Sequence, residues 1–67
     1  MVTINDLIRR ATELFESDFN LLAQARTGAQ GKEAAIGRLT MNGAPRWAAE
    51  YALRVTIAWF NMIEDDD

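Results

Sequence analysis

Along residues 3–26, apolar side chains recur every three or four residues, which is the period of an amphipathic α-helix. When each residue advances about 100° around the helix axis, the apolar side chains fall within one arc of roughly 160°. These are Ile4, Leu7, Ile8, Ala11, Leu14, Phe15, Phe19, Leu21, Leu22 and Ala25. Thr3 is a candidate N-cap, with Asp6 completing a weak capping box. The pattern predicts one long helix that ends at Gly28. The alternative is that Ser17 and Asp18 cap a second helix.

A shorter helix is predicted over residues 32–41, after a loop over residues 28–31. It would bury Ala35, Ile36 and Leu39. Gly37 weakens this prediction, because Gly costs about 1 kcal/mol relative to Ala inside a helix. A strand is the lesser alternative, since it would have no partner strand in this chain.

The last predicted helix covers residues 45–63, and Pro45 fits its first turn. Its polar strip is narrow and consists of Arg46, Glu50, Arg54 and Asn61. The rest of the helix is apolar over roughly 240°, which indicates cover on nearly all sides. Two further helices cannot supply that cover, so we expect contact between copies of the chain. The expected interface residues are Trp47, Tyr51, Val55, Trp59 and Met62.

The predicted fold class is all-α: a helical hairpin of two long helices with a short middle helix, assembling as a homodimer or larger bundle. Residues 1–63 form the single domain. Residues 64–67 form an acidic tail, which should fray because its carboxylates oppose the helix dipole. A chain of 67 residues buries only about 60% of its unfolded surface. Association with a partner is a common source of the missing stability.

Cys and His are both absent from the sequence. Their absence excludes a disulfide framework, the usual zinc sites and any Cys or His nucleophile or base. There is also no paired-carboxylate spacing, Gly-rich phosphate loop or Ser-centred elbow. The sequence therefore predicts a protein that is not an enzyme and has no cofactor.

The formal net charge is −3, and Glu64–Asp67 contribute −4, so the body through residue 63 carries +1. This distribution suits neither a DNA mimic nor direct DNA binding. No apolar run is long enough to span a membrane. Asp6 stands where a signal peptide would be apolar, so no signal peptide is expected. The absence of Cys favours the cytoplasm.

Asp18 lies in the middle of the apolar arc of residues 3–26. It could bind a ligand or act as an acid or base. We expect instead a structural buried carboxylate that caps a helix or pairs with an arginine, with Arg38 and Arg54 as the expected partners.

Arg46, Glu50 and Arg54 are spaced four residues apart and can form ion pairs along one exposed strip. Together with Asn61 they are the candidate residues for binding a partner or ligand. In an oligomer, two such strips could face each other and hold phosphates.

The layout of a short, acidic-tailed helical hairpin resembles the plasmid Rop protein. The segments Arg46-Trp47-Ala48-Ala49 and Ala58-Trp59-Phe60 resemble the last helix of phage cyclic-nucleotide sponges of the anti-CBASS type. The resemblance covers roughly a third of the chain and departs at the N-terminus. It implies a stoichiometric binder among small helical phage anti-defence proteins, which include the anti-CRISPR proteins.

The leading hypothesis is therefore a phage-type inhibitor that binds a host defence protein or protein complex in the bacterial cytoplasm. The first alternative is an oligomeric sponge for a small phosphorylated ligand such as a cyclic nucleotide. The second alternative is a Rop-like structural or RNA-associated bundle, for which Arg9 and Arg10 are the available basic residues.

Overall fold

A computed structural model describes residues 3–64, which form four α-helices and no strand. These are α1 (Ile4–Ser17), α2 (Phe19–Thr27), α3 (Ala29–Thr40) and α4 (Arg46–Glu64). The all-α prediction is confirmed. The chain is divided differently from the prediction, because the region expected to be one long helix is two helices.

The break between α1 and α2 lies at Asp18, whose backbone is not helical (φ −142°, ψ 83°). Its amide donates to the carbonyl of Leu14 at 2.9 Å and ends α1. Its carboxylate accepts from the amide of Leu21 at 3.1 Å and begins α2. The prediction of a single helix over residues 3–26 is wrong, and the alternative of a second helix capped here is correct. Asp prefers the N-cap to a helix interior because its short side chain can accept hydrogen bonds from nearby backbone amides.

The short helix is longer than expected. α3 begins at Ala29, so most of the predicted loop over residues 28–31 is helical, and Gly28 alone joins α2 to α3.

The predicted capping box at the start of α1 is confirmed. The Thr3 hydroxyl accepts from the amide of Asp6, and the Asp6 carboxylate accepts from the amide of Thr3, both at 3.1 Å.

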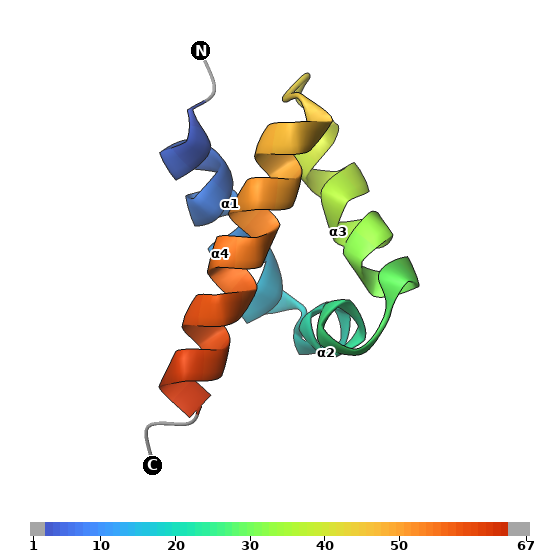
Figure 1. Cartoon of the computed structure of the whole chain (residues 1–67), viewed down its shortest axis with the longest axis vertical. Coiled ribbons are helices and arrows are strands. Elements are labelled where there is room, and N and C mark those ends of the chain that lie inside the picture. The colour runs from blue at the N-terminus through green and yellow to red at the C-terminus, as the bar shows by residue number, and fades with distance from the viewer. Residues whose placement is uncertain (1–2, 65–67) are drawn as a thin grey trace.

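Figure 1 shows how the helices are arranged. α1 and α4 cross each other while running in the same general direction, α2 lies across one end, and α3 carries the chain back to the start of α4. The two long helices therefore do not form the expected hairpin. Phe15 and Phe60 meet edge to face where α1 and α4 pack, with ring centroids 6.1 Å apart. The core consists of Leu7, Ala11, Phe15, Leu21, Leu22, Ala25, Ala35, Ile36, Leu39, Ala44, Ala48, Ala49, Ala52, Leu53 and Phe60.

Glu64, where the frayed tail was predicted to begin, is the last residue of α4. Its carboxylate lies 2.8 Å from the guanidinium of Arg26 on α2. This contact fixes the end of α4 to α2. Residues 65–67 of the predicted tail lie outside the described residues. None of the helices within residues 3–64 combines the length and the apolar character that crossing a membrane requires.

Candidate functional site

α4 has one outward face of large apolar side chains, made of Trp47, Tyr51, Val55, Trp59 and Met62. We call it the apolar face of α4. Trp47 and Met62 are each 65% exposed, Tyr51 is 52% exposed and Trp59 is 45% exposed. Val55, at the centre, is half-buried. All five residues that the sequence predicted for an oligomer interface therefore lie on one side of the helix, where four are exposed and Val55 is half-buried.

The reason for this exposure is that only part of the apolar arc of α4 is covered by the other helices. α1 packs against one flank and α3 against the other. The side chains between these contacts are buried: Ala48, Ala49, Ala52, Leu53, Thr56 and Phe60. The outward sector is covered only at its edge, where Val55 and Trp59 adjoin α1, so its aromatic side chains stay largely in contact with water.

A shallow groove between α1 and α4 adjoins the apolar face. It is lined by Ile8, Thr12, Val55, Thr56 and Trp59 and has a volume of about 260 Å³. Because Val55 and Trp59 belong to both, the groove extends the apolar face toward α1. Ile8 was predicted to be buried in the first helix, and it is only partly covered.

Phe19 is a further exposed aromatic residue, outside the apolar face of α4, and sequence reasoning missed it. It was placed in the apolar arc of the first helix, but its side chain is 66% exposed. The break at Asp18 changes the direction of the chain just before Phe19, so the wheel drawn for one continuous helix does not apply to it. Recognising Asp18 as an N-cap would have revealed the error.

Arg46, at the start of α4, joins α4 to α3. Its guanidinium donates to the carboxylate of Glu33 and lies 3.5 Å from the carboxylate of Glu50. The hydrogen bond from Arg46 lowers the pKa of Glu33, and the same bond raises the pKa of Arg46. Arg46 is thus engaged by two carboxylates, which reduces what it can offer to a phosphate.

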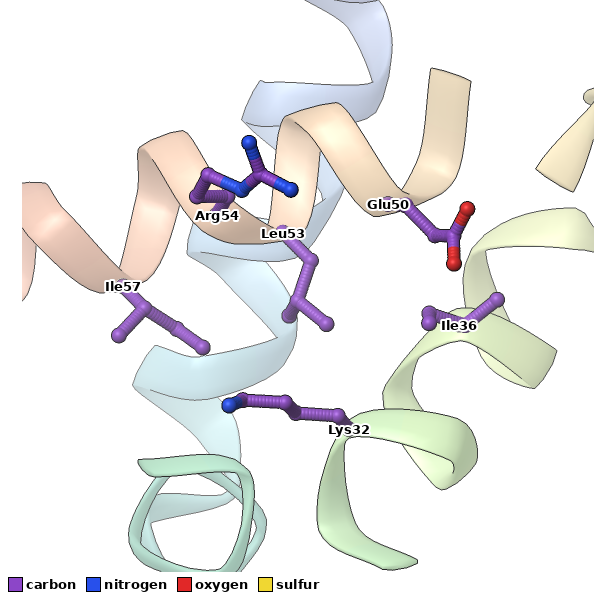
Figure 2. Close-up of a pocket in the computed structure, with 6 residues that line it drawn as sticks. All are labelled: Lys32, Ile36, Glu50, Leu53, Arg54 and Ile57. Carbon is purple, nitrogen blue, oxygen red and sulfur yellow. The ribbon is translucent and has the colours of Figure 1, made fainter. Parts of the chain in front are cut away.

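Arg54 and Asn61, the other predicted binding residues, are exposed. Neither makes a side-chain hydrogen bond or ion pair within residues 3–64. Arg54 instead lines a pocket between α3 and α4, shown in Figure 2. The pocket has a volume of about 280 Å³ and is lined by Lys32, Ile36, Glu50, Leu53, Arg54 and Ile57. Lys32 was not predicted as a site residue, because only the packing of α3 on α4 brings it near Arg54.

Asp18 is half-buried. It forms no ion pair with Arg38 or Arg54, since the ion pairs of the described residues all involve other carboxylates. The expected pairing with either arginine is therefore wrong, and its carboxylate is used by the amide of Leu21. The Asp18 carboxylate bonds to the Leu21 amide because this donor is only three residues away and is in place as soon as α2 forms. Arg38 and Arg54 lie on other helices, so a pair with either of them would require tertiary packing to bring it close.

No group of acidic side chains within residues 3–64 is arranged to hold a metal ion. Comparisons of the chain with protein-family models, curated proteins and solved structures found no match. The surfaces that remain as candidates are the apolar face of α4 and the α3–α4 pocket.

Proposed function

We propose that this is a non-enzymatic binding protein that self-associates through the apolar face of α4 and acts by contact with another protein. The observation that supports the proposal is the exposure of Trp47, Tyr51, Trp59 and Met62 on one side of a single helix. Trp and Tyr are enriched at the centres of protein interfaces, where they contribute much of the binding energy. Contiguous exposed apolar patches larger than a few hundred Å² mark interaction sites, and the largest patch on a small protein is often functional.

The exposed area of the apolar face of α4 can be compared with the area that a second copy of the chain would need to bury. An aromatic side chain buries about 150–250 Å², and the three on this face are 65%, 52% and 45% exposed. They therefore offer roughly 350 Å² per copy, which is near half of the 800 Å² or so that each partner contributes to a stable interface. Met62, Val55 and the groove beside Trp59 add to this contact.

An antiparallel pair of α4 helices, centred on Val55, would match these side chains. Trp47 of one copy would lie across from Met62 of the other, and Tyr51 across from Trp59. Opposed helix dipoles would favour this arrangement over a parallel one. A symmetric pair of this kind is closed, so it would yield a dimer and not a filament.

Sedimentation equilibrium tests the self-association. The protein should be a dimer of the 7.5 kDa chain at micromolar concentration. The double substitution Tyr51→Glu and Trp59→Glu should give a folded monomer, because it places charges in the centre of the interface. Phe19→Glu is the control, since Phe19 is more exposed than Tyr51 and Trp59 but lies on α2. It should leave the dimer intact. A monomeric wild-type protein at about 100 µM would refute the proposal.

The biological role that we propose for this binding is inhibition of a bacterial defence system, in the manner of a phage anti-defence protein. The support is the resemblance of the Arg46–Ala49 and Ala58–Phe60 segments, together with a surface that offers contact area to a protein partner. Expression in bacteria with an active CRISPR or CBASS system should restore plating of a phage that the system restricts. The Tyr51→Glu and Trp59→Glu variant should lose this effect. Unchanged restriction across such systems would argue against the role.

A small phosphorylated ligand is the second candidate, and the uncompensated charge of Arg54 favours it. Arg46 contributes less, because Glu33 and Glu50 already neutralise it. Calorimetric titration with cyclic dinucleotides tests this candidate directly. Binding that is lost in Arg54→Gln would support a sponge.

A further inference from the structure

We propose that the α3–α4 pocket binds an acidic amphipathic helix of a partner protein. An aliphatic side chain of that helix would enter the pocket, and a carboxylate one turn away would lie in the positive field of Lys32 and Arg54. This inference rests on the proposed function in one respect, which is that the partner is a protein. It concerns a different surface from the apolar face of α4.

The charges on α3 and α4 do not balance at this pocket. Residues 28–63 contain four cationic residues, Lys32, Arg38, Arg46 and Arg54, and two acidic residues, Glu33 and Glu50. Both carboxylates are drawn to Arg46. Lys32 and Arg54 consequently have no carboxylate partner among residues 3–64. A partner that brings a carboxylate would supply the missing negative charge.

The floor of the pocket is aliphatic. Leu53 and Ile36 are nearly buried, and Ile57 is half-buried. Figure 2 shows Lys32 reaching from α3 past the tip of Leu53 toward Ile57, with Arg54 on the α4 side of the same leucine. The lining contains no aromatic ring on which a nucleobase could stack. The pocket therefore suits a branched aliphatic side chain more than a nucleotide.

Glu50 limits what the pocket accepts. Its carboxylate also lines the pocket, and it would repel a ligand that carries several negative charges. The repulsion grows with the charge of the ligand, so a single carboxylate is repelled less than a polyphosphate. Leu and Glu spaced four residues apart lie on the same side of a helix, so one turn of a partner helix can present both groups.

The test uses a blocked Ala-rich helical peptide that carries Leu and Glu four residues apart. NMR spectra of the full chain report on the methyl groups of Ile36 and Ile57. Peptide at up to about 1 mM should shift these signals along a saturable curve. Replacing Lys32 and Arg54 by Gln should weaken binding about tenfold, since two exposed charge contacts are lost. Arg38→Gln is the control, because Arg38 is an exposed cation of α3 outside the pocket, and it should leave the affinity unchanged.

The peptide itself provides a second control. A peptide in which Glu is replaced by Gln should bind about tenfold more weakly, and binding of the original peptide should weaken as NaCl rises from about 0.05 to 0.5 M. The salt series keeps the test decisive even where the double variant fails to fold. Equal binding of both peptides, the absence of any shift, or shifts caused by sodium octanoate and not by the peptide would each overturn the proposal.

The result of the peptide-binding test can be distinguished from the result of the self-association test. Loss of peptide binding in the Lys32 and Arg54 variant should leave the sedimentation of the dimer unchanged. Dissociation of the dimer by the same variant would show that the pocket is occupied by a second copy, and this would also overturn the proposal.

Discussion

Gly31 should be one of the least replaceable residues in this protein, although it has no side chain. It lies in α3 where this helix passes α2, and it is buried. A Cβ atom added at Gly31 would lie 2.2 Å from the carbonyl carbon and 2.3 Å from the carbonyl oxygen of Gln24, and 2.5 Å from the amide nitrogen of Ala25. Ordinary contacts at a Cβ begin at about 3.4 Å. Because all three neighbours are backbone atoms of α2, no side-chain rotation can relieve the clash, and the two helices must separate by about 1 Å.

The expected cost of Gly31→Ala follows from two opposing effects. Overpacking a closely packed site costs about 3 kcal/mol or more when backbone must move. Ala gains about 1 kcal/mol over Gly in helix propensity. The free energy of unfolding should therefore fall by at least about 2 kcal/mol. For a domain of this size this corresponds to a decrease in Tm of roughly 10 °C.

Gly37→Ala is the matched control in the same helix. A Cβ at Gly37 meets no atom within 4 Å, so only the propensity gain remains. This variant should be more stable than the wild type by about 0.5–1 kcal/mol. Urea and thermal denaturation followed by far-UV circular dichroism, at one fixed protein concentration, measure both effects. If Gly31→Ala matched or exceeded the stability of the wild type, the close packing of α2 on α3 would be wrong.

Two further predictions concern the helix caps, and both are read from denaturation curves. Asp18→Ala should lower the free energy of unfolding by about 1 kcal/mol, whereas Asp18→Asn should be nearly neutral because Asn also caps helices well; a large loss in the Asn variant would point to an ion pair instead. The hydrogen bond that the Thr3 amide donates to the Asp6 carboxylate, with a further contribution from the Thr3 side chain, lowers the pKa of Asp6 below the ordinary 3.8. The stabilisation by Asp6 should therefore be complete above this value and disappear as the pH falls through the folded pKa. Asp6→Ala should accordingly destabilise the protein at pH 7 and have little effect near pH 2, and an equal effect at both pH values would contradict this assignment.

The pattern of apolar residues was sufficient to predict that the chain is all-α and roughly where its helices lie. The capping box at Thr3, Gly28 as the end of a helix and Pro45 just before α4 are signals carried by a few neighbouring residues. Such signals act through hydrogen bonds and steric restrictions within one helical turn, so they can be recognised without knowledge of the fold. The wide apolar arc of α4 was likewise visible in the sequence, and its outward part is the apolar face described above.

Tertiary packing decided the features that depend on residues far apart in the sequence. The break at Asp18 is different, because its cap is a local contact with the amide of Leu21, but the periodicity of apolar residues does not register one non-helical residue. Gly31 was assigned to a loop, since a glycine needed for close helix contact and a glycine in a turn look alike in sequence. Lys32 came to line the same pocket as Arg54 only because α3 packs along α4. For Gly31 and Lys32 the deciding contact joins two helices, and the chain direction after the break at Asp18 determines which helices can meet.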